Sequence, residues 1–268
     1  MNRIHLVIID PQKDFASSEG SLFVPGADSD MKDRLPKMIK RIGHKIDDIH
    51  VTLDSHRQFH IANPLYWKDS KGNHPNPFTL ISVSDVEKGI WTPSVPSLYA
   101  HSLNYVKELE RKGRFILCIW PPHCLIGTSG ATVVDELKDA ILEWERNEMG
   151  MTNFITKGSN FKTEHYSAIA AENPDPSDPT TQINVDFINT LTTDCEIALL
   201  CGECSSHCLK ATVEDIWNNF KDPQAVKKIV LLTDAMSPVP GFEKQAQSFL
   251  DEAKARGVQF STTVDFLK

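Results

Sequence analysis

The sequence lacks an excess of basic residues, a long apolar run and an export signal. Its 268 residues include 28 Lys and Arg against 36 Asp and Glu, a formal net charge of −8 that disfavours binding to nucleic-acid phosphates. No stretch approaches the ~18 consecutive apolar residues of a membrane span, and the apolar run over residues 6–9 is too short for a secretory signal. We therefore expect a cytoplasmic protein with no nucleic-acid partner and no membrane partner.

Internal repeats and linker-like segments are also absent, which favours a single domain over residues 1–268. A chain of this length can bury a large core without disulfides or structural metals. Since no export signal is present, the six cysteines are expected to be reduced thiols, available for catalysis or metal binding. They are Cys118, Cys124, Cys195, Cys201, Cys204 and Cys208.

Short apolar runs alternate with helical patterns along the chain. The runs predict strands over 4–9, 48–53, 114–119, 151–156, 196–201, 228–233 and 258–262. Near-continuous apolar runs are typical of parallel strands that are covered on both faces. Apolar residues at helical spacing predict helices around 31–42, 103–109, 134–144, 209–220 and 242–253, of which the first is weakened by Pro36. The alternation predicts an α/β fold with a doubly wound parallel sheet flanked by helices.

One long connection, over residues 59–102, has little regular pattern. It carries several prolines and glycines, and long irregular connections in compact domains are functional or disordered. It is also rich in aromatic residues, in which disordered segments are poor. We expect an ordered excursion that packs over the sheet edge, in the manner of a lid.

Several chemically active side chains follow the predicted strands, where ligands bind in open α/β sheets. Asp10 ends the first strand and could be a general base or only a turn residue. Asp54 and His56, with His60 beyond them, have the types and spacing of Zn, Mn or Fe ligands, although such spacing also occurs by chance. A further ligand could come from His123, which follows another predicted strand.

Lys157 closes a predicted strand and precedes a glycine. Most lysines are solvated surface groups, and that interpretation is favoured for Lys157 taken alone. At a site, its charge would stabilise a thiolate or a carboxylate.

The segment GECSSHC at 202–208 leads into a predicted helix. Cys208 falls at the helix start, where the backbone N–H groups and the helix dipole favour the thiolate, with Ser205 or Ser206 as candidate N-cap. A buried packing thiol is the competing interpretation. The pair Cys201 and Cys204 could also be a redox or zinc pair, but no second such pair accompanies it.

Taken together, these residues resemble the isochorismatase-like cysteine hydrolases, and within them the nicotinamidase/pyrazinamidase branch. The matching motifs follow the order of that family over nearly the whole chain: IIDPQKDF at 8–15, GSLFVPGA at 20–27, DSH at 54–56, WPPHCLIGTSGA at 120–131, TKG at 156–158 and GECSSHC at 202–208. The resemblance implies a Rossmann-like parallel sheet. It further implies a catalytic triad of Cys208 as nucleophile, Asp10 as general acid and base, and Lys157.

The resemblance also implies the rest of the site. A divalent metal (Zn, Fe or Mn) would be bound by Asp54, His56 and His123, whereas His60 matches a position that is a ligand in only some members. The backbone N–H groups of Cys204 and Cys208 would form the oxyanion hole, with a cis peptide bond between Glu203 and Cys204. Phe15 and Trp120 would sandwich the substrate ring.

The implied function is a metal-dependent cysteine amidohydrolase that converts nicotinamide to nicotinate and ammonia through a thioester. The chain departs from the family at Ser55, at the SSHC loop and in the longer 59–102 connection, which leaves the substrate open. Two alternatives therefore stand: a cysteine hydrolase of the same fold acting on another small amide, and a catalytically silent binding protein. We expect a small-molecule amide as partner, and a homo-oligomer is an open alternative to a monomer.

Overall fold

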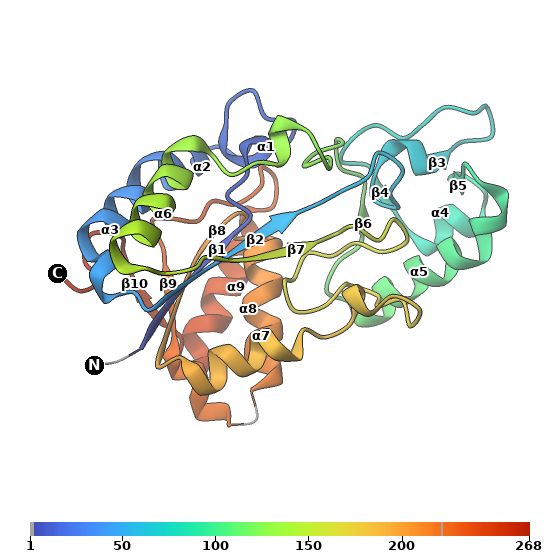
Figure 1. Ribbon diagram of the computed structural model, residues 1–268. Coiled ribbons are helices and arrows are strands. Elements are labelled where there is room, and N and C mark those ends of the chain that lie inside the picture. The colour runs from blue at the N-terminus through green and yellow to red at the C-terminus, as the bar shows by residue number, and fades with distance from the viewer. Residues whose placement is uncertain (1–2, 221) are drawn as a thin grey trace.

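A computed structural model describes residues 3–220 and 222–268 of the chain. Its centre is a six-stranded, wholly parallel sheet in the order β10-β9-β8-β1-β2-β7 (Figure 1). The strands are β1 (Ile4–Ile9), β2 (Asp48–Asp54), β7 (Asn153–Lys157), β8 (Ile197–Gly202), β9 (Ile229–Leu232) and β10 (Gln259–Ser261). Every residue of β1 is buried, as expected for a central strand covered on both faces. The predicted α/β fold is confirmed.

Helices cover the two faces of the sheet. On one face α3 (Leu35–Ile42) packs against α6 (Asp135–Glu148), and on the other lie α8 (Cys208–Asn219) and α9 (Glu243–Arg256) (Figure 1). The remaining helices are α1 (Lys13–Ala16), α2 (Ala27–Ser29), α4 (Val83–Glu87), α5 (Tyr99–Lys112) and α7 (Val185–Asn189). No helix in the described part of the chain has the length and apolarity to cross a membrane.

The prediction of a central strand over 114–119 is wrong. Only Leu117–Cys118 form a strand, β6, and it pairs antiparallel with β4 (Leu80–Ile81) in a separate two-stranded sheet. The place beside β2 belongs to β7. The run is apolar because Leu117 and Cys118 are buried, and burial alone does not distinguish a central strand from any other covered extended segment.

Pro36 does not interrupt the helix predicted around 31–42. It is the second residue of α3 and follows directly on helical residues, and the φ that its ring fixes is compatible with a helix. A π-helical turn, Asp30–Arg34, precedes it and continues the helical path from α2. The helical path from α2 to α3 is therefore continuous through the proline.

The excursion over 59–102 is ordered, as predicted, and lies beyond the carboxyl ends of the central strands (Figure 1). It contains α4 and a short antiparallel pair, β3 (Trp67–Lys68) with β5 (Thr92–Pro93). Tyr66 and Trp67 are fully buried, which explains its aromatic content. A second irregular segment, residues 158–184, also crosses this end of the sheet, and its course was not predicted.

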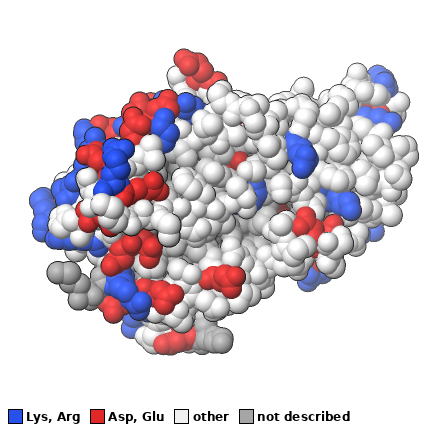
Figure 2. Space-filling model, viewed as in Figure 1, with Lys and Arg blue, Asp and Glu red and all other residues white. Residues whose placement is uncertain are grey.

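Acidic and basic side chains are interspersed on the face seen in Figure 2, mostly over the end that carries α3 and α6. The surface in front of β7 on this face is mostly uncharged. Phe154, which belongs to β7, has an exposed side chain. No basic patch is visible in this view, in keeping with the acidic composition.

Candidate active site

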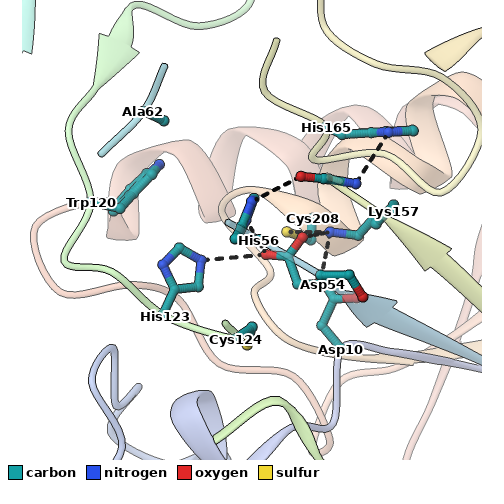
Figure 3. A network of polar contacts seen from close by, with 12 residues as sticks. Asp10, Asp54, His56, Ala62, Trp120, His123, Cys124, Lys157, His165 and Cys208 are labelled. Carbon is teal, nitrogen blue, oxygen red and sulfur yellow. Dashed lines mark hydrogen bonds and ion pairs between the residues drawn. The ribbon is translucent and has the colours of Figure 1, made fainter. Parts of the chain in front are cut away.

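Three of the predicted site residues meet at one ammonium group. Lys157 Nζ lies 2.8 Å from Asp10 Oδ2, 2.9 Å from Asp54 Oδ1 and 3.6 Å from Cys208 Sγ (Figure 3). All four residues are buried, and they come from the ends of β1, β2 and β7 and the start of α8. The surface interpretation of Lys157 is therefore wrong. The register of the parallel strands accounts for the meeting, because Asp54 pairs directly with Lys157 across β2 and β7.

Asp10 is held by β2 as well as by Lys157. Its backbone N–H donates to Thr52 Oγ1 at 3.0 Å, and the same hydroxyl donates to Asp10 Oδ1 at 2.5 Å. Burial raises the pKa of Asp10 above its usual value, although Lys157 opposes the shift. A carboxylate with a raised pKa is suited to accept and return a proton.

Lys157 is charged despite its burial. Burial alone would lower its pKa, but the carboxylates of Asp10 and Asp54 raise it well above the usual value. The same ammonium and the neighbouring His56 hold the pKa of Asp54 well below its usual range, against the effect of burial. The site thus keeps a fixed positive charge beside the sulfur atom of Cys208.

Cys208 is the first residue of α8, as predicted, but two expectations about it are corrected. The N-cap residue is His207 rather than a serine, and the Ser206 hydroxyl instead contacts His207 Nδ1 at 2.9 Å and accepts from Val239 N–H at 3.1 Å. Burial raises the pKa of the Cys208 thiol well above its usual value, although Lys157 opposes this. Desolvation outweighs the opposing charge of Lys157, which favours the thiol form, and formation of the thiolate then needs a base.

The other cysteines are buried thiols away from the Lys157 ammonium group. All six are free and buried, so Cys201 and Cys204 form no disulfide. Burial raises the pKa of the Cys118, Cys195 and Cys201 thiols, and these side chains belong to the hydrophobic core.

The predicted metal ligands also converge. One potential ligand atom from each of Asp54, His56 and His123 lies within 4.8 Å of the other two, and all three side chains are buried. Asp54 Oδ2 is 3.0 Å from His56 Nε2 and 3.4 Å from His123 Nε2, so Asp54 stands between the histidines and Lys157 (Figure 3). His123 reaches β2 because residues 124–126 form a parallel bridge with His56.

The outer ring nitrogens favour this ligand set. His56 Nδ1 lies 3.2 Å from the Gly158 carbonyl and His123 Nδ1 lies 2.8 Å from the Pro121 carbonyl, so each Nδ1 donates and each Nε2 is left to bind a cation. Although burial disfavours its charge, the adjacent Asp54 raises the pKa of His56 to about 9. The environment therefore attracts positive charge, and the residues fit a divalent ion.

His60 differs from these ligands. Its Nε2 lies 3.1 Å from the Thr163 carbonyl, and its Nδ1 accepts from Ala62 N–H at 3.2 Å. Both ring nitrogens are thus used by the backbone, although His56, His60 and Glu164 form a further group of potential ligand atoms. These backbone contacts favour His56 and His123 over His60 as ligands.

Other motif residues hold the site together rather than line it. Gln12 exchanges two hydrogen bonds with the backbone of Asp54, both 2.7 Å long, and so fastens the end of β1 to the end of β2. Asp14 accepts from Cys124 N–H at 2.7 Å. Gly158 has φ +84°, and a Cβ there would lie 2.9 Å from the His56 ring, so a larger residue would displace a candidate ligand.

A narrow cavity opens beside Cys208 and has aromatic walls. Trp120 and Phe15 line it, as the resemblance implied, and Trp120 Nε1 donates to the Tyr166 hydroxyl at 3.0 Å. The full lining is Phe15, Leu22, Asp54, Trp120, His123, Glu164, Tyr166, Cys204, His207, Cys208 and Val239. The excursion over 59–102 contributes none of these residues. It supports the wall from behind, where the Ala62 carbonyl accepts from Trp120 N–H at 2.7 Å, so the expectation of a lid is not met.

Glu164 and Tyr166 were missed by the sequence analysis. Both are buried, and Glu164 Oε2 has no hydrogen-bond partner among the described residues. They lie in the irregular segment 158–184, which has no periodic pattern to place it. The adjacent acid and histidine at 164–165 were the one local signal, and this signal is weak.

The segment before α8 has the expected geometry. The peptide bond between Glu203 and Cys204 is cis. Gly202, with φ +114°, lets β8 pass close to β1, because a Cβ there would lie 2.2 Å from the Ile9 carbonyl oxygen. Cys204 and Cys208 both line the cavity.

No protein-family model and no curated protein matches the sequence. Solved structures do match the fold over nearly the whole chain. Yeast nicotinamidase Pnc1p bound to the inhibitor nicotinaldehyde has a TM-score of 0.65 at 18% identity, covering 97% of this chain and 99% of that one. An Acinetobacter nicotinamidase/pyrazinamidase gives 0.64 at 18%, covering 99% of each chain. A Pyrococcus horikoshii pyrazinamidase in complex with zinc gives 0.57 at 20%, covering 97% and 99%.

Proposed function

We propose that the protein is a metal-dependent cysteine amidohydrolase that converts nicotinamide to nicotinate and ammonia. The main observation in support of this proposal is the position of the buried Lys157. Its Nζ contacts both the Asp10 carboxylate and the Cys208 sulfur beside a cavity with aromatic walls. The fold shared with nicotinamidases and pyrazinamidases supports the choice of substrate. A cytoplasmic location remains a prediction from the sequence, and a homo-oligomer remains an open alternative to a monomer.

In the proposed acylation, Asp10 removes the Cys208 proton, and the thiolate sulfur forms a bond to the amide carbon. Potential ligand atoms of Asp10, Asp54 and Cys208 lie within 4.8 Å of one another, which is compatible with proton transfer after a small approach. The Lys157 ammonium stabilises the thiolate, and the N–H groups of Cys204 and Cys208 donate to the oxyanion. Protonated Asp10 then gives its proton to the departing nitrogen, which leaves as ammonia.

Deacylation reverses these roles. Asp10, again ionised, takes a proton from water while the water oxygen attacks the thioester carbon. Collapse of the adduct expels the Cys208 thiolate and leaves nicotinic acid, which ionises to nicotinate in solution, and the proton on Asp10 returns to the sulfur. The balance is one amide and one water consumed, and one carboxylic acid and one ammonia formed.

Asp54, His56 and His123 would hold a divalent ion at the other side of the cavity. Bound there, the ion would supply Lewis-acid chemistry, including affinity for a pyridine nitrogen that orients the ring. The residues of the chain do the remaining work, since Phe15 and Trp120 confine a flat ring from two walls.

The proposal predicts a selective pattern of ammonia release. Purified protein should turn over nicotinamide and pyrazinamide, which carry a ring nitrogen, and should turn over benzamide and short aliphatic amides much more slowly. Steady-state ammonia detection over this panel makes the measurement. Turnover of aliphatic amides without turnover of nicotinamide would favour the second candidate function, in which the protein hydrolyses another small amide. No turnover of any amide, with a Cys208 that resists iodoacetamide, would favour a silent binding protein.

Metal dependence gives a separate prediction with its own readout. The protein should retain one divalent ion per chain, and His123→Ala should bind it at least about 100-fold more weakly, because a direct ligand matters no less than an outer-sphere partner. His44→Ala is the matched control, because His44 is exposed and has no place in the ligand group. Elemental analysis and isothermal titration test the binding. Unchanged ammonia release after complete chelation would remove the metal from the proposed reaction.

A further inference from the structure

Glu203 is a fully buried acid in the segment that precedes Cys208, and the proposed reaction gives it no role. It directly precedes Cys204, whose N–H is a proposed oxyanion donor. Its side chain leads away from the cavity toward Asp30, which lies in the π-helical turn before α3 and is also buried. Two buried carboxyl groups that bind the same residue, Ser237, need an explanation, because two negative charges in that environment repel strongly.

Ser237 joins the two acids. Its backbone N–H donates to Glu203 Oε2 at 3.2 Å, and its hydroxyl donates to Asp30 Oδ2 at 2.7 Å. Arg34 donates to Asp30 Oδ1 at 2.6 Å and also to the Asp234 carbonyl at 3.0 Å. Asp30 therefore has two donors that favour its ionised form. Glu203 Oε1, in contrast, accepts a hydrogen bond from no donor among the described residues.

A single proton held between Glu203 and Asp30 would remove the repulsion between two buried negative charges. Burial, and then the charge of Asp30, raise the pKa of Glu203 well above its usual value, and a hydrogen bond between the two carboxyl groups contributes in the same direction. Burial also raises the pKa of Asp30, but the hydrogen bonds from Ser237 and Arg34 oppose that shift, which favours Glu203 as the neutral donor and Asp30 as the charged acceptor. The other titratable groups that face Glu203 are Asp10 from the end of β1 and the thiols of Cys201 and Cys204 from its own segment.

The backbone around Glu203 is fastened at the same place. Glu203 N–H donates to the Ile9 carbonyl at 2.8 Å, Gly202 N–H to the Ala235 carbonyl at 2.8 Å, and Ser205 N–H to the Ser237 carbonyl at 2.9 Å. The side-chain contact with Asp30 adds a link from this segment to the helical layer that covers the other side of the sheet. The 203–205 segment is therefore anchored on β1, on the turn after β9 and on the π-helical turn before α3.

We propose that Glu203 is a positioning residue for the proposed hydrolysis: protonated and bound to Asp30 and Ser237, it holds the segment that presents Cys204 N–H and Cys208 to the substrate carbonyl. The inference rests on the proposed function and deepens it. It assigns no bond-making step to Glu203. It makes the geometry of the oxyanion donors depend on one proton outside the cavity.

The test compares Glu203→Gln with Glu203→Val. Glutamine keeps an N–H donor for Asp30, so its kcat for nicotinamide at neutral pH should stay close to that of the parent. Valine removes the link and should lower kcat about 100-fold with little change in KM, which is the expected size for a displaced catalytic donor. The affinity for pyridine-3-carbaldehyde, whose adduct with Cys208 carries an oxyanion, should weaken in parallel with kcat.

The pH dependence separates positioning from a merely structural role. As pH rises, Glu203 ionises in the parent and repels Asp30, so the kcat ratio of Glu203→Gln to the parent should increase with pH. Thermal stability should diverge in the same sense, because an acid whose pKa is raised on folding loses its contribution as pH rises above its unfolded value. Full activity in Glu203→Val, or a loss of kcat in Glu203→Gln as large as that in Glu203→Val, would overturn the proposal.

Glu172→Gln is the matched control. Glu172 is also a buried glutamate, lies 3.9 Å from Arg114, and has its pKa raised to about 7 by burial. Its substitution should change stability but leave kcat and aldehyde affinity unchanged. If Glu172→Gln lowered kcat as much as Glu203→Val does, the loss would be a general packing effect, and the positioning role of Glu203 would be refuted. If the parent releases no ammonia, the proposed function fails, and the rate of Cys208 alkylation as a function of pH in the Glu203 variants still decides whether the link positions this segment.

Discussion

Replacement of Cys208 by alanine is expected to lower ammonia release from nicotinamide by about 10⁴-fold or more, because no other group can form the thioester. The fold should persist. Lys157 keeps its contacts with Asp10 and Asp54 in the variant, at 2.8 and 2.9 Å in the parent, so no buried charge loses its partner. Rate measurements with the thermal unfolding temperature of each protein make the comparison.

Cys201→Ala provides the matched control for a buried thiol. Cys201 lies on β8, its Sγ contacts the Val7 carbonyl at 3.8 Å, and it does not line the cavity. The Cys201→Ala variant should be somewhat less stable than the parent and should release ammonia at the same rate. Mass spectrometry of the parent, quenched during turnover, should find the acyl group on the peptide that contains Cys208. Undiminished turnover in Cys208→Ala would refute its assignment as nucleophile.

Replacement of Lys157 by methionine is expected to have the second large effect, on stability as well as on rate. The variant leaves Asp10 and Asp54 buried without their shared cation, and removal of one partner of a buried ion pair costs about 3–5 kcal/mol. Loss of the charge beside Cys208 should also lower ammonia release by about 10²–10³-fold, as removal of one electrostatic donor does in other sites.

The pH dependence of the Lys157→Met variant has a defined sign. Without the ammonium, the buried carboxyl groups take up protons more readily in the folded state than in the unfolded state. Their contribution is therefore retained at low pH and lost as pH rises through their raised values. The stability gap between the parent and Lys157→Met should widen from pH 5 toward pH 8 in denaturant titrations.

Lys13→Met is the control for Lys157. Lys13 Nζ lies 2.9 Å from Asp135 Oδ2, the same separation as Lys157 from Asp54, but this pair is on the surface. A solvent-exposed ion pair contributes about 0–1 kcal/mol, so Lys13→Met should change stability little at any pH. A Lys157→Met variant as stable and active as Lys13→Met would contradict the buried charge network.

The local sequence patterns were sufficient to predict the strands that support the candidate site and the residues at the ends of these strands. The apolar runs predicted six strands of the central sheet to within a few residues, and the carboxyl ends of parallel strands meet at one edge. For that reason Asp10, Asp54 and Lys157 could be grouped before any contact was known, and the start of the helix after the fifth predicted strand added Cys208. The run over 114–119 failed because burial beneath the excursion produces the same apolar pattern as a central strand.

The sequence by itself determined the alternation of strands and helices and the kinds of side chain at the strand ends, because both follow from local periodicity and turn chemistry. Tertiary structure decided the protonation of Cys208, the freedom of the His56 and His123 nitrogens to bind a cation, the place of Glu164 and Tyr166 in the cavity wall, and the contact of Glu203 with Asp30. These properties depend on how deeply each group is buried and which charge lies beside it. Segments far apart in the chain set both quantities, and no local pattern contains them.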